Sequence, residues 1–165
     1  MVVRGTKKLL DLLGGSALIL SDLPAADGDW YANLLWLDRQ KCLLLTHSGT
    51  LFSVFRPGVR VADFRPIGPY VVGAIEAELF AENLPSDTFG QLDAASVCLA
   101  RTASPSVLGF MNEMAFQVRY NVERNGGLDR CETGTINHQL RRTLHNKGEY
   151  VFPLDLVAQL LAGRD

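Results

Sequence analysis

The stretch that decides the fold reads WYANLLWL at residues 30–37, DRQ at 38–40, KCLLLT at 41–46, HSGT at 47–50 and LFSVF at 51–55. Three β-prone runs are therefore separated by short connections that contain turn-forming residues. Connections of this length join strands that run antiparallel and lie side by side. The stretch predicts a three-stranded antiparallel meander over residues 30–55.

Outside the meander, the apolar residues recur at helical rather than strand spacing. Residues 1–5 and 97–101 favour two further strands, and residues 16–29 are expected to be irregular. Helices are expected after Thr6 up to Gly14-Gly15, from Val71 to 83–85, from Pro105 to 124, over 136–146 and over 154–161. We therefore predict an α+β fold, with a small antiparallel meander sheet of three to five strands packed against four to five helices in a single domain, residues 1–165.

Composition is that of an ordinary globular protein, with 47% hydrophobic and 21% charged residues and a formal net charge of -2. No overall electrostatic attraction to nucleic acid or anionic lipid follows from this charge, so any such binding must be local. The first residues carry Arg4, Lys7 and Lys8 and do not resemble a secretory leader, and no apolar run is long enough to span a membrane. Three widely spaced cysteines fit reduced thiols, so a cytoplasmic location is expected.

Basic residues gather in the last third of the chain. Residues 61–100 hold six acidic residues and one basic residue, whereas residues 101–148 hold seven basic and four acidic ones. On the helix predicted over 136–146, one face carries Ile136, Leu140 and Leu144, and the opposite, solvent-facing side carries His138, Arg141, Arg142 and His145. This basic face either contacts phosphates or an acidic partner, or is an ordinary solvated surface.

The first helix places Lys7 and Lys8 in its opening turn, where the helix dipole favours acidic residues instead. An anion bound at the free N–H groups would remove this penalty, which makes Gly5, Thr6, Lys7 and Lys8 a candidate phosphate or carboxylate cradle. The spacing does not match a Walker motif, and two solvated lysines are the simpler alternative.

Aromatic residues suggest two further contact points. Strand alternation places Trp30 and Tyr31 on opposite faces, so one is expected in the core and the other partly exposed beside Asn33, Arg39 and Lys41. An exposed ring there could stack on a base or anchor a partner. Phe116 and Tyr120 form a second apolar line on the long helix, which is then either buried on two sides or part of a dimer contact.

No catalytic or metal-binding set is found. Cys131, His138 and His145 recur every seven residues, which in a helix separates neighbours by about 10 Å, too far to share one zinc ion. No G-x-S-x-G or H-E-x-x-H motif is present. We therefore expect no catalytic residues, no metal and no cofactor.

Several blocks resemble an uncharacterised bacterial family of domains of unknown function over nearly the whole chain. They are TKKLL at 6–10, WYANL at 30–34, SVLGFMNE at 106–113 and the segment Asn137 to Leu140. The resemblance implies one intact domain and no particular activity. It directs attention to the polar members of these blocks, Lys7, Lys8, Asn33, Asn112 and Asn137, of which the three asparagines are expected to be buried and to cap backbone groups.

These observations favour a non-catalytic binding or regulatory domain of a small bacterial cytoplasmic protein, which recognises a protein partner or forms a homodimer. Nucleic-acid binding through local basic patches is the second hypothesis, and an enzyme or binder for an anionic small molecule at the first helix N-terminus is the third. The candidate binding residues are Thr6, Lys7, Lys8, Tyr31, Asn33, Arg39, Asn112, Asn137, Arg141 and Arg142, with Lys41 added for nucleic acid.

Overall fold

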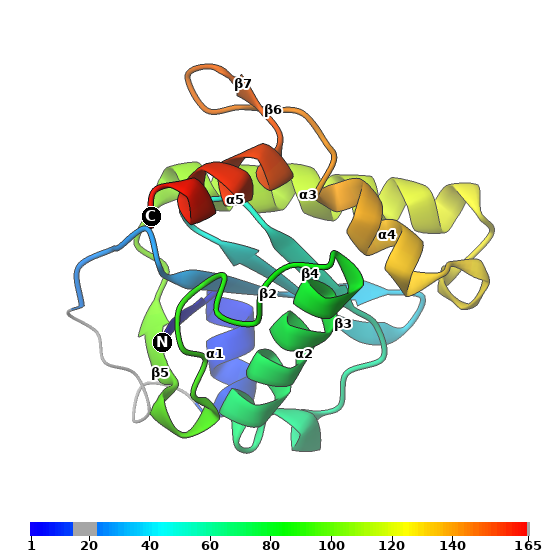
Figure 1. Ribbon diagram of the computed structural model, residues 1–165. Helices are drawn as coiled ribbons and strands as arrows, with labels where there is room; N and C mark the ends of the chain where they lie inside the picture. Colours follow the sequence, from blue (N-terminus) through cyan, green and yellow to red (C-terminus); the bar gives the residue numbers. More distant parts are fainter. Residues whose placement is uncertain (15–22, 165) are drawn as a thin grey trace.

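A five-stranded sheet with strand order β4-β3-β2-β1-β5 forms the centre of the molecule. Figure 1 shows the computed structural model, which describes residues 1–14 and 23–164. The strands are β1 (Val2–Gly5), β2 (Trp30–Leu37), β3 (Gln40–His47), β4 (Ser53–Arg56) and β5 (Cys98–Arg101). The predicted meander is confirmed, because β2 pairs antiparallel with β3 and β3 pairs antiparallel with β4. Residues 15–22 of the segment expected to be irregular lie outside the described residues.

The sheet is mixed, whereas an antiparallel sheet was predicted. Strand β1 runs parallel to both of its neighbours, with Val3 opposite Trp30 of β2 and opposite Leu99 of β5. The direction follows from the connection, because helix α1 (Lys7–Leu13) leaves the end of β1 and the chain then returns to the start of β2. The α+β class itself is confirmed.

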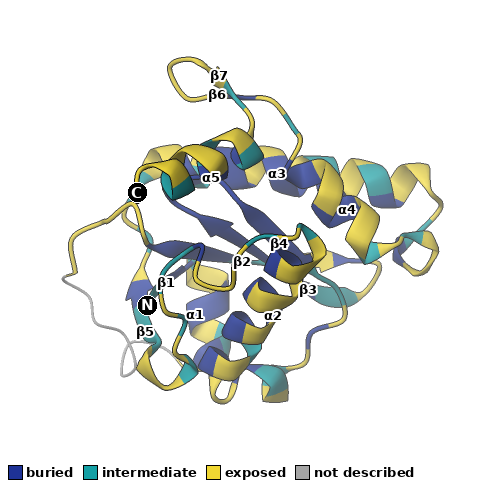
Figure 2. Cartoon of the chain, in the orientation of Figure 1, coloured by how far each residue is buried: buried dark blue, intermediate teal, exposed yellow. Residues whose placement is uncertain are grey.

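Helices cover both faces of the sheet. Helix α1, α2 (Ile67–Ala81) and α5 (Pro153–Ala162) pack on one apolar core, which includes Leu9, Ile75 and Val157. Helix α3 (Pro105–Arg124) and α4 (Thr133–Leu140) pack on the residues that point from the other face, among them Leu44 and Phe55. Figure 2 shows the buried sheet between these exposed layers. Among the described helices, none is long and apolar enough to cross a bilayer.

The helix predicted over 136–146 is wrong in its extent, because α4 begins at Thr133 and ends at Leu140. The Thr143 hydroxyl donates to the carbonyl of Gln139 at 2.9 Å, and Leu144 is 49% exposed instead of continuing the apolar stripe. A small hairpin follows, made of β6 (His145–Asn146) and β7 (Tyr150–Val151). Local side-chain bonding to the backbone competes with helix continuation at such positions.

The first helix begins after Thr6 and ends at Gly14, as predicted. Gly14 adopts the left-handed conformation with φ 113°, and its N–H donates to carbonyls of the last turn, a common way to end a helix. The Thr6 side chain does not cap the helix, because its hydroxyl donates instead to Oδ1 of Asn33 on β2, at 3.2 Å.

Candidate functional site

Helix α3 has one buried face and one outward face. The buried face carries an apolar stripe at helical spacing, made of Val107, Phe110, Met111, Met114 and Val118. Phe116 and Tyr120 point the other way and are 71% and 54% exposed. Of the two alternatives, burial of this helix on two sides does not hold, and a dimer contact stays a prediction. Two large aromatic side chains one helical turn apart are left on the surface.

Helix α4 is fixed against the free edge of β4 by a buried asparagine. Oδ1 of Asn137 accepts a hydrogen bond from the Phe55 N–H at 2.6 Å, and its Nδ2 donates to the Phe55 carbonyl at 3.1 Å. The side chain thereby imitates the pairing of another strand. The expectation that Asn137 is buried and caps backbone groups is confirmed, and the edge of β4 is closed at this point.

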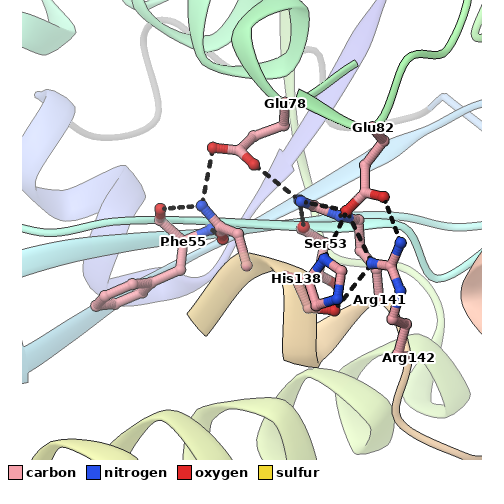
Figure 3. A network of polar contacts seen from close by, with 8 residues as sticks. Ser53, Phe55, Glu78, Glu82, His138, Arg141 and Arg142 are labelled. Carbon is pink, nitrogen blue, oxygen red and sulfur yellow. Dashed lines mark hydrogen bonds and ion pairs between the residues drawn. The ribbon is translucent and has the colours of Figure 1, made fainter. Parts of the chain in front are cut away.

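A buried ion cluster holds α4 to α2, as Figure 3 shows. The Arg141 guanidinium lies 2.9 Å from the Glu78 carboxylate and 2.7 Å from that of Glu82. Arg142 also contacts Glu82, at 2.7 Å. Hydrogen bonds from Arg142 and then from Arg141 lower the pKa of Glu82 to about 2, against the opposing effect of burial. Glu82 is thus ionised at neutral pH.

Arg141 does not lie on a solvent-facing basic surface, as the sequence suggested, because it is 1% exposed. Its partners Glu78 and Glu82 were not singled out from the sequence, where they read as surface positions of a helix. A signal was present, however, because Glu78 follows Ile75 by three residues and therefore shares the buried side of α2.

Between α3 and α4 the surface is hollowed into a groove of about 510 Å³, here called the α3–α4 groove. Two contacts join its walls: Nδ2 of Asn121 donates to Oε1 of Gln139 at 3.0 Å, and the Thr143 hydroxyl lies 3.0 Å from the side-chain amide of Gln117. The lining residues are aromatic, amide-bearing or basic: Phe116, Gln117, Tyr120, Asn121, His138, Gln139, Arg142 and Thr143. Aromatic rings can bury an apolar side chain, and the amides can pair with a peptide backbone.

The groove holds no pair suited to proton transfer. Nδ1 of His138 lies 3.8 Å from Oε1 of Glu82, but that carboxylate is occupied by the two arginines and its lowered pKa makes it a weak base. Within residues 1–14 and 23–164, no group of three or more His, Cys, Asp or Glu side chains could hold a metal ion.

The other two histidines are buried. Burial lowers the pKa of His47 to about 4, and its Nδ1 lies 3.0 Å from the Thr50 hydroxyl. The His145 ring packs edge-on against Phe110, and its Nδ1 lies 3.5 Å from Oε2 of Glu113. The His145 side chain is 0% exposed, so a substrate cannot reach it.

The residues of the proposed anion cradle at the first helix are not arranged around one common site. Lys7 is exposed and pairs with Asp11 one turn later, at 2.6 Å. Lys8 is exposed, and Gly5 is packed so tightly that a Cβ atom there would lie 2.7 Å from the Leu10 side chain. Lys7 thus has an ion-pair partner within its own helix, at a solvent-exposed position.

The basic residues suggested for nucleic-acid binding do not converge. Lys7 and Lys8 lie on helix α1, which follows β1, whereas Arg141 is buried at the β4 edge. Strand β1 is three strands from β4, a separation of about 14 Å across the sheet. Arg39 lies in the exposed β2–β3 turn, at the far end of β2 from Ala32, which pairs with the end of β1. Arg142 alone reaches the α3–α4 groove.

Tyr31 and two of the asparagines also differ from expectation. Tyr31 and Trp30 are both buried, at 0% and 1% exposure, because each face of the sheet is covered by helices. Asn33 is half-buried and accepts the Thr6 hydroxyl rather than capping backbone, and Asn112 is exposed on α3. Lys41 lies with its ammonium 5.0 Å from the centre of the exposed Trp36 ring.

Fold and site together define an α+β domain with a helix-covered mixed sheet and an aromatic surface groove. Residues 2–156 match the family model DUF6933, a domain of unknown function, and the chain belongs to this family. The resemblance to a family of domains of unknown function over nearly the whole chain is thereby confirmed. No curated protein matches the chain.

Proposed function

We propose that this chain is a non-catalytic recognition domain of a bacterial cytoplasmic protein, which binds a short apolar segment of a protein partner in the α3–α4 groove. The observation that carries the proposal is the 71% exposure of Phe116 on the outward face of a well-packed helix. Burial of a Phe side chain contributes about 1.5–3 kcal/mol, so a partner that covers it gains a substantial part of its affinity there.

The rigidity of the groove supports the same proposal. The ion cluster and Asn137 hold α4 in place from below, while the Asn121–Gln139 and Thr143–Gln117 hydrogen bonds join its two walls. A preformed groove loses little conformational entropy when it binds. Its volume of about 510 Å³ suits one or two large side chains with their backbone. The thiols Cys42, Cys98 and Cys131 are free, which fits a reducing compartment.

A peptide-display selection tests this function. The immobilised chain is used to select binders, and peptides that also bind the Phe116→Ser variant are removed. We expect enriched peptides with aromatic or aliphatic residues that bind the unmodified chain in calorimetry and lose at least tenfold in affinity for Phe116→Ser.

Phe80 provides the matched control, because it is 85% exposed on α2, which packs on the other face of the sheet. Peptide affinity for the Phe80→Ser variant should equal that for the unmodified chain. If no selected peptide distinguishes Phe116→Ser from Phe80→Ser, the groove is not a recognition site. Single-stranded RNA and DNA are titrated in parallel, and binding of nucleic acid with loss in Phe116→Ser would replace the protein partner by the second hypothesis.

A further inference from the structure

The hairpin of β6 and β7, here called the arm (residues 144–152), extends away from the body of the molecule (Figure 1). It turns at Gly148, which has φ 92°. Its large apolar side chains are exposed: Leu144 at 49%, Tyr150 at 74% and Phe152 at 40%. Each strand has only two residues, and an isolated hairpin of this size is marginal in water. A second surface packed against the arm would stabilise it.

The base of the arm is nonetheless held firmly. His145 is buried against Phe110 of α3, and Pro153 at the start of α5 is buried as well. The Lys147 ammonium donates to the carbonyl of Gly49 at 2.9 Å. These contacts tie the β6 side of the arm, from His145 to Lys147 beside the turn, to the body, while Tyr150 on the β7 side stays 74% exposed.

The arm and the α3–α4 groove are complementary in chemistry. The groove offers exposed Phe116 and Tyr120 with His138 and Arg142 at its rim, and the arm offers Tyr150 with the exposed carboxylate of Glu149 beside it. No arm residue lines the groove of its own chain. An unfilled aromatic groove and an uncovered aromatic arm therefore occur on one molecule, a short distance along the chain from each other.

We propose that the partner of the groove is a second copy of this chain, whose arm inserts Tyr150 beside Phe116 and Tyr120. This inference rests on the proposed function of the groove. Because each copy has both an arm and a groove, a two-fold arrangement makes the same contact twice and closes the assembly as a dimer. Glu149 then approaches the 40% exposed Arg142 side chain at the rim of the partner's groove, but because Arg142 already pairs with Glu82 at 2.7 Å, the contact rests mainly on the aromatic side chains.

Light scattering after size exclusion, over a concentration series, measures the assembly. The mass should be twice the 18.1 kDa of one chain. Tyr150→Ser on the arm and Phe116→Ser in the groove should each weaken dimerisation at least tenfold, whereas the exposed control Phe80→Ser should not. Both substituted side chains are largely exposed, so the variants are expected to fold, which circular dichroism verifies.

A disulfide trap tests the contact itself. Chains with Gln139→Cys in the groove and chains with Glu149→Cys on the arm are mixed, both with the half-buried Cys98 and Cys131 replaced by serine. The mixture should form a cross-linked dimer under mild oxidation much faster than either variant alone. Equal rates would overturn the arm-in-groove contact.

The outcomes separate this inference from the proposed function. A monomer at every concentration that still binds selected peptides through Phe116 overturns the self-association and leaves the recognition function standing. A dimer that is insensitive to both Tyr150→Ser and Phe116→Ser overturns the arm contact, and the peptide selection, carried out with the Tyr150→Ser chain, then decides the function of the groove alone. A monomer that selects no peptide overturns both.

Discussion

The Arg141 guanidinium and the Glu78 carboxylate lie 2.9 Å apart, and both side chains are covered by the protein. The pair joins the end of α4 to α2 beyond the edge of β4, where Arg141 also donates to the Ser53 carbonyl at 3.3 Å. It therefore determines where α4 lies, and with it one wall of the α3–α4 groove.

Replacement of Arg141 by Met should lower the free energy of unfolding by about 3–5 kcal/mol, because Glu78 is then left buried without its counter-charge. Urea denaturation measures the change. Arg142→Ala is the control, since that side chain is 40% exposed, and its loss should be about 1 kcal/mol or less. The double variant Glu78→Gln/Arg141→Met should recover part of the loss, and a cost for Arg141→Met no larger than that of Arg142→Ala would contradict a stabilising role for the pair.

Asn137→Leu should cost about 3 kcal/mol, because the Phe55 N–H and carbonyl would both lose their partners in the interior. Asn112→Leu, at an exposed position of α3, should change stability by about 0.5 kcal/mol or less. Thermal unfolding of the two variants compares the same chemical change at a buried and an exposed site. Similar melting temperatures would show that the amide does not close the β4 edge.

Stability should fall as the pH drops from about 6.5 toward 4. His47 keeps its ring neutral in the folded state, where burial first and Lys147 second lower its pKa to about 4, while the unfolded chain takes up the proton near its ordinary value. The full effect is about 3 kcal/mol, present above pH 6.5 and lost below it. Urea midpoints at pH 7.5 and pH 4.5 measure it, and a His47→Asn variant should show a flatter dependence on pH within this window.

A second fall in the free energy of unfolding, here called the acid limb, should appear below about pH 4.5. Glu82 is held ionised by Arg142 and Arg141 with a pKa of about 2, so its contribution is complete above the ordinary carboxyl pKa and is lost as the pH falls toward 2. Glu82→Gln should remove this limb while it leaves the His47 window unchanged. A variant with the acid limb intact would mean that other carboxylates govern acid unfolding.

Phe116→Ser should leave the melting temperature nearly unchanged, because the ring makes few contacts within the chain at 71% exposure. Phe110→Ala on the same helix should cost about 3–5 kcal/mol, since that ring is 8% exposed in the core. Differential scanning calorimetry distinguishes them. A large loss of stability for Phe116→Ser would indicate that the ring belongs to the structure rather than to an interface.

The meander over residues 30–55 could be predicted because its strands pair with their neighbours in the sequence and are joined by short turns. The parallel pairing of β1 could not be read in the same way, since Val3 meets Leu99 across 96 positions and no turn residue records that contact. The charge of Arg141 also led to a wrong prediction of its position. Arg141 reads as a surface residue by its charge, and only the folded chain reveals that Glu78 and Glu82 lie opposite it.

The candidate site also has a part that the sequence predicts and a part that depends on distant contacts. Phe116 and Tyr120 stand out from the sequence because they fall off the buried stripe of α3, which is a property of one helix alone. The groove itself requires α4 to lie beside them, and α4 is placed by Asn137 and by the ion cluster. Sequence periodicity indicates which side of a helix is apolar, whereas the neighbour of that side is set by distant contacts.

The position of β1 has a consequence for how the nascent chain assembles. Its residues leave the ribosome long before those of its partner β5 at positions 98–101. Until then one side of β1 has unsatisfied backbone groups, which other chains could pair with. Closing so large a loop is slow, so the last step of folding is expected to be the docking of β5 onto β1, after the 30–55 meander has already formed.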